Sequence, residues 1–196
     1  HYISIQYLNQ IHCLACGKST SKSYNQGYCF MCFRKLAVND MCVMKPELCH
    51  FEQGTCREPD WGMAHCMQPH IVYLAWSSGL KVGLTKPSQI PTRWIDQGAS
   101  EAVAVCQVAS RYHAGLLEDY LRSWYNDRTN WRKMITHQGG AEIDMLQEAQ
   151  TAQERVKMAS LPQEVMSQVQ YMPLDIRRFE YPVESFGPIK SLSLDK

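Results

Sequence analysis

The chain has 196 residues, 45% of them hydrophobic, and a formal net charge of +1 at pH 7. This length and composition allow one ordinary globular core and a small second module, and no stretch of the sequence is apolar over the length that a membrane span requires. The near-neutral charge excludes a global electrostatic field that would attract nucleic acid, so such a partner would have to bind a local patch.

Residues 1–69 hold eight of the nine cysteines and almost no apolar run long enough to form a core. The first four cysteines form two Cys-x-x-Cys pairs, CLAC and CFMC, twelve residues apart. Four thiolates at this spacing are typical of one tetrahedral zinc site. Gly17 and Gly27 flank the pairs and suit the tight turns that such loops require. We therefore predict a zinc-ribbon-like module whose ligands are Cys13, Cys16, Cys29 and Cys32.

The next four cysteines predict a second structural zinc ion, because metal ligation would replace the missing core. An imidazole could take the place of one thiolate, since His50 follows Cys49 and His65 precedes Cys66. A disulfide framework and an iron–sulfur cluster are the alternatives for the clustered cysteines. The Cys-x-x-Cys spacing favours a metal, and the lack of a secretory signal favours a cytoplasmic location. The simplest ligand set for the second zinc is Cys42, Cys49, Cys56 and Cys66.

A β-branched and aromatic pattern begins at residue 70. Residues 71–76 and 80–85 predict a β-hairpin. A helix, a strand and a longer helix are predicted to follow, over residues 91–97, 102–108 and about 111–125. Cys106 lies in the apolar strand, where a free thiol usually behaves as a small hydrophobic core residue.

The sequence beyond Gly139 and Gly140 is rich in Gln and Glu and predicts a helical extension over residues 139–174. Pro162 would end its first helix, and the second would reach about Met172. A thin apolar stripe would leave much of the helical surface over residues 141–172 for a protein partner, and packing on the rest of the domain is the alternative. Residues 175–196 predict a C-terminal β segment. The chain opens without an initiator methionine, so we expect a fragment trimmed at both ends.

Four residues on the middle elements resemble the landmarks of the GIY-YIG nuclease superfamily. They lie on the first strand, the second strand, the short helix and the long helix, and are Tyr73, Gly83, Arg93 and Glu118. The resemblance implies an α+β domain over residues 70–138, a small antiparallel sheet flanked by helices. It implies that Tyr73 helps to activate water, Arg93 steadies the scissile phosphate and Glu118 holds one Mg²⁺ or Mn²⁺ ion. Val82 is interpreted as standing where the second tyrosine of the family belongs, which would remove a phenol from the catalytic face.

Longer stretches are similar to a bacterial family of uncharacterised proteins, DUF2797. The stretches are PELCH, GTCREPDWG, HIVYLAWSSGLKVGLT, IPTRWIDQGA and DRTNWRKM. This likeness covers roughly residues 10–196. It implies additional β structure beyond both ends of the chain and little about activity.

The nuclease resemblance, together with the predicted zinc sites, implies a zinc-stabilised nuclease that hydrolyses phosphodiester bonds in DNA or RNA with one divalent metal. The segment DRTNWRKM places cations beside an indole, which could contact a nucleic-acid backbone and stack on a base. Its candidate residues are Arg128, Trp131, Arg132 and Lys133. The alternatives are a catalytically inactive nucleic-acid-binding module and a protein-interaction module on the same fold. Glu118 alone is also explained by an ion pair with Arg122, four residues further along the helix.

Overall fold

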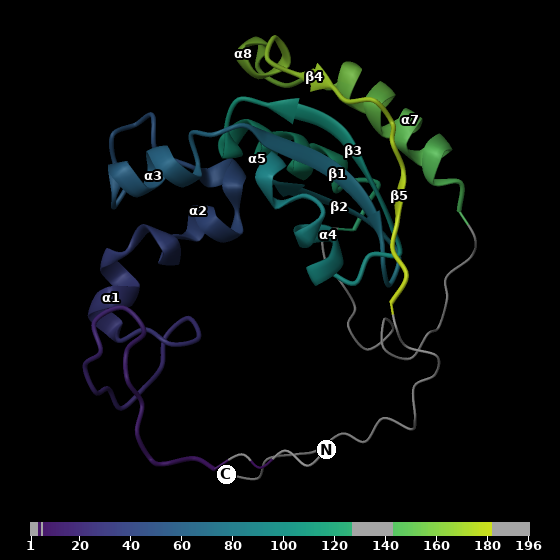
Figure 1. Ribbon diagram of the computed structural model, residues 1–196. Coiled ribbons are helices and arrows are strands. Elements are labelled where there is room, and N and C mark those ends of the chain that lie inside the picture. Colours follow the sequence, from purple (N-terminus) through teal and green to yellow (C-terminus); the bar gives the residue numbers. More distant parts are fainter. Residues whose placement is uncertain (1–3, 5, 127–142, 182–196) are drawn as a thin grey trace. The chain divides into compact units, whose positions relative to one another are not determined.

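The computed structural model describes residues 4, 6–126 and 143–181. The chain divides between Cys66 and Met67 into two compact units, whose elements are labelled in Figure 1. The cysteine-rich module predicted over residues 1–69 therefore corresponds to the first unit, apart from three residues. The later predicted segments all belong to the second unit.

The first unit is made of short helices joined by loops. Its elements are α1 (Phe30–Lys35), η1 (Ala37–Asn39), α2 (Met41–Met44), η2 (Pro46–Leu48) and α3 (Pro59–His65), where η denotes a 3-10 helix. Two isolated β-bridges precede α1, between His12 and Ser19 and between Tyr24 and Tyr28. The first bridge encloses one Cys-x-x-Cys pair, and the second lies immediately before the other pair.

The first unit has almost no apolar core. Among its described residues, the buried hydrophobic side chains are those of Cys13, Ala37 and Cys66. Larger apolar side chains lie at the surface, for example Leu14, which is 74% exposed, and Met31, which is 72% exposed. A module of this size usually needs a metal or disulfides when hydrophobic burial is so small. The expected shortage of core is confirmed.

The second unit is built on an antiparallel sheet. Its strands are β1 (His70–Trp76), β2 (Leu80–Thr85), β3 (Glu101–Val108), β4 (Gln170–Tyr171) and β5 (Arg177–Arg178). The order is β2-β1-β3-β4, and β5 also pairs with β3. All of these pairs are antiparallel. The predicted hairpin and third strand are therefore confirmed, and β2 is an edge strand of the sheet.

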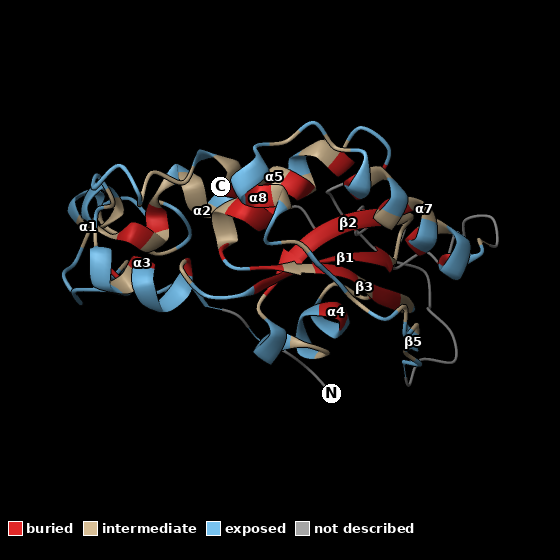
Figure 2. Cartoon of the chain, turned by 90° about the horizontal axis from the view of Figure 1, so that it is seen from above, coloured by how far each residue is buried: buried red, intermediate tan, exposed pale blue. Residues whose placement is uncertain are grey.

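Helices cover both faces of this sheet. The helical elements of the second unit are η3 (Pro87–Gln89), α4 (Thr92–Asp96), α5 (Arg111–Leu121), α7 (Met145–Lys157) and α8 (Gln163–Met166). Figure 2 shows α5 and α7 on one side of the strands and α4 on the other. The described part of the chain is thus a mixed α+β fold with a small antiparallel sheet and an N-terminal cysteine cluster.

Alternation along β1 divides the core into two apolar clusters. Val72 and Leu74 belong to the larger cluster, which includes Leu117 of α5 and Val156 of α7. Tyr73 belongs to the smaller cluster on the opposite face, which includes Trp94 of α4. Cys106 is fully buried in the larger cluster, so its predicted role as a core residue is confirmed.

The second helix of the predicted extension is shorter than expected. It ends at Met166, and Gln170 and Tyr171 form β4 against β3. The prediction of a helix to about Met172 is therefore wrong. The side-chain amide of Gln153 donates hydrogen bonds to the carbonyls of Val105 and Met172, at 2.9 and 2.8 Å. These contacts hold the segment beside β3, so tertiary packing overrides its helical pattern.

Only β5 represents the predicted C-terminal β segment within the described residues. Across residues 4–126 and 143–181, the helices are too short or too polar to span a lipid bilayer.

Candidate metal centre and candidate active site

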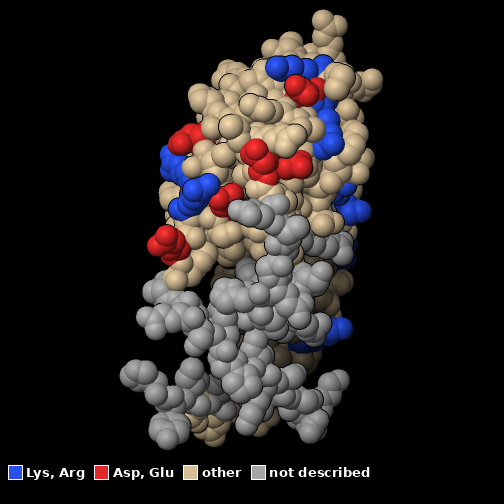
Figure 3. Space-filling model, turned by 90° about the vertical axis from the view of Figure 1, so that its right-hand side faces the viewer, with Lys and Arg blue, Asp and Glu red and all other residues tan. Residues whose placement is uncertain are grey.

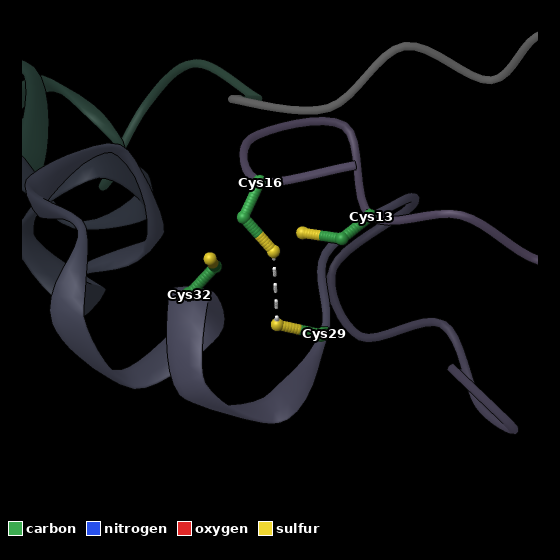
Figure 4. Close-up of side chains that lie close together, drawn as sticks. All are labelled: Cys13, Cys16, Cys29 and Cys32. Carbon is green, nitrogen blue, oxygen red and sulfur yellow. Dashed lines mark hydrogen bonds between the residues drawn. The ribbon is translucent and has the colours of Figure 1, made fainter. Parts of the chain in front are cut away.

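Four thiols from two separate loops meet in the first unit. The sulfur atoms of Cys13, Cys16, Cys29 and Cys32 all lie within 4.8 Å of one another. The sulfur atoms of Cys16 and Cys29 are 3.9 Å apart, and Figure 4 shows the four side chains pointing toward a common centre. A tetrahedral zinc ion with Zn–S bonds of about 2.3 Å would separate its sulfur ligands by about 3.8 Å. This group of four cysteines therefore fits a structural zinc site.

The local backbone explains why the two loops converge. Gly17 has φ +69° and Gly27 has φ +142°, values that favour glycine. The amide N–H of Leu14 in the first loop donates a hydrogen bond to the carbonyl of Gly27, at 2.8 Å. The Leu14 side chain also covers Gly27, because a Cβ at residue 27 would overlap its Cδ1 atom. The two glycines thus supply the turns that the sequence predicted.

Two of the four thiols have pKa values shifted in opposite directions. A hydrogen bond from the backbone of Cys29 is the main cause that lowers the pKa of Cys13 to about 6. A side-chain hydrogen bond with Cys29 is the main cause that raises the pKa of Cys32 to about 12. A thiol with a lowered pKa gives up its proton first, and zinc ligation requires the thiolate form. Metal binding to this cluster therefore releases protons.

The other four cysteines of the first unit line one small cavity. The cavity has a volume of about 10 Å³, and its polar lining consists of Asp40, Cys42, Cys49, His50, Cys56, Arg57 and Cys66. Burial, followed by the charges of Asp40, Cys49 and Cys66, raises the pKa of Cys42 to about 12. Ligand atoms of Asp40, Cys42 and His50 lie within 4.8 Å of one another. The predicted second set of cysteines is therefore gathered around one cavity, although it forms no four-sulfur cluster as tight as the first.

The two neighbouring histidines differ in position. His50 lines the cavity, its Nε2 atom lies 3.5 Å from Asp40, and its Nδ1 atom hydrogen-bonds to Thr55 at 2.7 Å. His65 instead stacks on Trp61, with ring centroids 4.3 Å apart. Of the two predicted substitutes for a thiolate, only His50 shares the cavity. The sequence did not predict Asp40 as part of this cavity. Asp40 lies beside the cysteines because it is the N-cap of α2, where its carboxylate accepts a hydrogen bond from the Cys42 N–H.

Tyr73 lies in the middle of β1, on the face that α4 covers, and its side chain is fully buried. Its ring packs edge-on against Trp94, and its hydroxyl donates a hydrogen bond to Oε1 of Gln97, at 2.9 Å. Gly83 of β2 is its cross-strand partner, and the ring lies across this glycine. A Cβ at residue 83 would stand only 2.6 Å from the Tyr73 hydroxyl oxygen. Since β2 is an edge strand, the hydroxyl points toward that edge of the sheet.

Two charged side chains act on this hydroxyl. Arg93 is an exposed residue of α4, and Glu118 is a half-buried residue of α5. Burial raises the pKa of Tyr73, the charge and hydrogen bonding of Arg93 oppose that rise, and the Glu118 charge adds to it. The charges of both predicted partners therefore contribute to the pKa of Tyr73, with opposite signs. Arg122 forms an ion pair with Asp119, at 3.4 Å.

Val82 does not share this face of the sheet. It is 1% exposed and packs in the larger apolar cluster, beneath α5. The interpretation that Val82 takes the place of a tyrosine on the catalytic face is therefore wrong, because alternate residues of a strand point to opposite faces. Lys81, which pairs with Ala75, is the β2 residue that lies beside Gly83 on the Tyr73 face. Because residues two apart on a strand share a face, the sequence could have shown that Lys81 lies on the same face as Gly83.

The predicted nucleic-acid-binding residues Arg128, Trp131, Arg132 and Lys133 lie outside the described residues. Figure 3 shows one face of the molecule, on which the described Lys and Arg side chains are interspersed with Asp and Glu. This mixture agrees with the net charge of +1. It does not provide a single-sign patch on the described part of that face.

Replacing Gly83 by alanine should displace the Tyr73 ring, because the new methyl group would overlap the hydroxyl and the ring carbon that bears it. We expect a loss of about 1–3 kcal/mol in the free energy of unfolding, typical of an overpacked core. Urea unfolding followed by tryptophan fluorescence would measure the loss, since four of the five tryptophans follow residue 67. In a Tyr73→Leu background the same change should cost less than about 0.5 kcal/mol. An equal cost in both backgrounds would contradict the described ring position.

A family model described as "Protein of unknown function (DUF2797)" matches residues 1–196. Neither a curated protein nor a solved structure matches the chain.

Proposed function

The chain belongs to the DUF2797 family of unknown function, and we propose from its own residues that it is a zinc-stabilised, GIY-YIG-like nuclease that hydrolyses phosphodiester bonds in DNA or RNA. The observation that carries this proposal is the arrangement around Tyr73. The charges of Arg93 on α4 and Glu118 on α5 both influence the pKa of Tyr73 on β1, so a guanidinium and a carboxylate from separate elements act on one phenol. These are the groups needed to orient water, neutralise a phosphate and hold a divalent cation.

Tyr73 orients the attacking water in this proposal. Its raised pKa keeps the phenol protonated at neutral pH, and that proton is donated to Gln97. The lone pairs of the hydroxyl oxygen then remain available to accept a hydrogen bond from water. Gln97 acts as a positioning residue because it fixes the direction of the phenolic proton. Tyr73 therefore aligns the water without removing its proton.

Arg93 and Glu118 have separate roles at the scissile phosphate, one as a cation and the other as a metal ligand. The exposed guanidinium of Arg93 can neutralise a non-bridging phosphate oxygen. Glu118 provides one carboxylate, a donor set that suits Mg²⁺ or Mn²⁺ when water and phosphate complete the coordination. Such an ion, when bound, stabilises negative charge on the phosphate and the leaving oxygen. In the net reaction, the water oxygen bonds to phosphorus, one P–O ester bond breaks, and the leaving oxygen ends with a proton from water.

Zinc has a structural role in this proposal. The four-cysteine cluster of the first unit would hold one ion, and the cavity lined by Cys42, Cys49, Cys56 and Cys66 would hold a second. The side chain of Arg57 lies 2.6 Å from Asp40 and pairs with its carboxylate, and thiolates are the usual ligands of structural zinc. In this arrangement Asp40 and His50 lie beside the four thiols and do not bind the zinc ion themselves.

A non-catalytic nucleic-acid-binding module is the second candidate. The complete burial of Tyr73 favours it, because a phenol enclosed by Trp94 and Gln97 has limited access to water. The same fold would then bind nucleic acid and leave its phosphodiester bonds intact.

A cleavage assay on the zinc-loaded protein separates these functions. End-labelled single-stranded DNA, duplex DNA, branched DNA and single-stranded RNA would be incubated with Mg²⁺, with Mn²⁺ or with EDTA. We expect cleavage of at least one substrate with Mg²⁺ or Mn²⁺ and none with EDTA. Binding of these substrates without cleavage would favour the second candidate. A protein that neither binds nor cleaves any of them would contradict both.

A further inference from the structure

Residues 1–39, which include the first metal centre, contain cations and no acidic side chain. All 19 Asp and Glu residues of the chain lie at Asp40 or beyond it. The Lys and Arg side chains of the segment are all exposed, and they are Lys18, Lys22, Arg34 and Lys35. Zinc bound by four thiolates carries two negative charges, which these four cations more than offset. The segment that contains the zinc ligands is therefore positive, although the whole chain is nearly neutral.

Two of these cations lie on a pair of aromatic rings. The ring centroids of Tyr24 and Phe30 are 5.4 Å apart. The ammonium of Lys22 lies 5.4 Å from the Tyr24 centroid. The guanidinium of Arg34 lies 5.6 Å from the Phe30 centroid. Phe33 stacks on Tyr24 at 5.8 Å and supports its position. The residues that form this aromatic–cation surface are Lys22, Tyr24, Phe30 and Arg34.

The first metal centre positions both rings of the aromatic–cation surface. Tyr24 forms a β-bridge with Tyr28, in which each amide N–H donates to the other residue's carbonyl, at 2.8 and 2.9 Å. Tyr28 is followed directly by the ligand Cys29, which is the N-cap of α1. Phe30 and Arg34 then lie on α1 itself. The surface therefore depends on the same loop and helix that hold two of the predicted zinc ligands.

Packing alone does not account for this surface. A ring that only filled the small core of the unit would be buried, but Phe30 is 48% exposed. Exposed aromatic rings beside Lys and Arg match the two parts of single-stranded nucleic acid, because rings stack on unpaired bases and cations contact phosphates. A duplex would hide its base faces from the rings. An acidic protein would match the cations and leave the rings without a specific partner.

We propose that the aromatic–cation surface of the first unit binds single-stranded nucleic acid, with its two rings stacking on bases and its two cations contacting phosphates. This inference goes beyond the proposed function, because the surface lies in the zinc-binding unit and uses none of the residues around Tyr73. It would bind nucleic acid whether or not the second unit cleaves it. Zinc would then maintain a binding surface in addition to the fold of its unit.

Binding of fluorescein-labelled oligothymidylate to the zinc-loaded full chain tests this surface. Fluorescence anisotropy would be measured without Mg²⁺ or Mn²⁺, at several KCl concentrations, for the wild type, Phe30→Leu and Lys22→Gln. We expect Phe30→Leu to bind roughly tenfold more weakly with an unchanged salt dependence, because it loses one base–aromatic stack and no charge. Lys22→Gln should make the slope of log K against log salt concentration shallower by about 0.7, the value for one phosphate contact with a single strand.

Lys45→Gln is the matched control, because it removes the same charge from an exposed residue of the same unit, at the end of α2. Its affinity and its salt dependence should equal those of the wild type. Zinc content would be measured for every variant, so that a lost contact is separated from a lost fold. Lys22 precedes the Tyr24 bridge and lies outside α1, so Lys22→Gln still tests the surface if Phe30→Leu loses zinc.

The proposal would be overturned by a wild type that does not bind oligothymidylate, or by wild-type affinity in both Phe30→Leu and Lys22→Gln. Equal weakening by Lys45→Gln would also overturn it. Duplex DNA bound as tightly as the single strand would contradict stacking on bases, and polyglutamate bound as tightly would assign the surface to an acidic protein instead. Oligothymidylate binding through this surface by a protein that cleaves no nucleic acid would support the surface and contradict the nuclease. Cleavage by a protein whose binding is unchanged in both variants would do the reverse.

Discussion

Replacing Cys29 by serine is expected to remove one zinc ion and to unfold the first unit, while the second unit stays folded. The apparent binding free energy of a structural zinc ion at four thiolates is about 10–16 kcal/mol at neutral pH, as large as the whole stability of a typical domain. The first unit has little else to stabilise it, because its buried apolar side chains among the described residues are those of Cys13, Ala37 and Cys66. The second unit has its own core on both faces of the sheet. Elemental analysis would give the zinc content, and amide hydrogen exchange would show which unit has lost protection.

Cys106→Ser is the control for this variant. Cys106 is fully buried in β3 and lies in the other unit, so its replacement should lower the stability of the second unit and leave the zinc content unchanged. The wild type should carry close to two zinc ions per chain. One ion in a folded wild type would remove the second site from the proposal. A Cys29→Ser protein that keeps all its zinc would show that the first ligand set is wrong.

The first metal centre could be predicted because its ligands and its turn residues lie close together in the sequence. Two Cys-x-x-Cys pairs and two glycines specify the loops, and the described backbone has φ +69° at Gly17 and φ +142° at Gly27. The second set of cysteines has irregular spacing. The sequence therefore predicted that these thiols share one site, but it did not show whether His50 or His65 lies beside them. That choice depends on packing, since His65 stacks on Trp61 and His50 faces Asp40.

The candidate active site could be predicted only in part. The positions of Tyr73 and Gly83 follow from the hairpin, whose register is fixed by its short turn. The contact of Gln97 with the Tyr73 hydroxyl depends on how the end of α4 packs, which no periodic pattern encodes. The placement of Lys81 was available from strand alternation, and the assignment of Val82 to the Tyr73 face overlooked it. The strand at Gln170 depends on pairing with a segment over sixty residues earlier in the chain, so a local helical pattern could not reveal it.

Glu118→Gln is expected to abolish divalent-metal-dependent cleavage and to leave folding almost unchanged. The amide keeps the size of the carboxylate but loses its charge, so it is a poor ligand for Mg²⁺ or Mn²⁺. Glu118 is half-buried on α5, and a substitution of similar shape there should change the free energy of unfolding by less than about 1 kcal/mol. If the metal supplies several kcal/mol of transition-state stabilisation, the rate should fall by at least about a thousandfold. Single-turnover cleavage rates, measured with saturating protein, would separate this loss from a change in binding.

Asp119→Asn is the matched control, because it removes the same charge from the next residue of the same helix. Asp119 is exposed and pairs with Arg122, an interaction that contributes little at the surface. This variant should therefore cleave at the wild-type rate. Arg93→Ala should also slow cleavage sharply, since it removes the exposed cation of the phosphate site. Glu118 would be excluded as the metal ligand by a Glu118→Gln protein that retains wild-type cleavage with Mg²⁺, because another residue would then have to hold the ion.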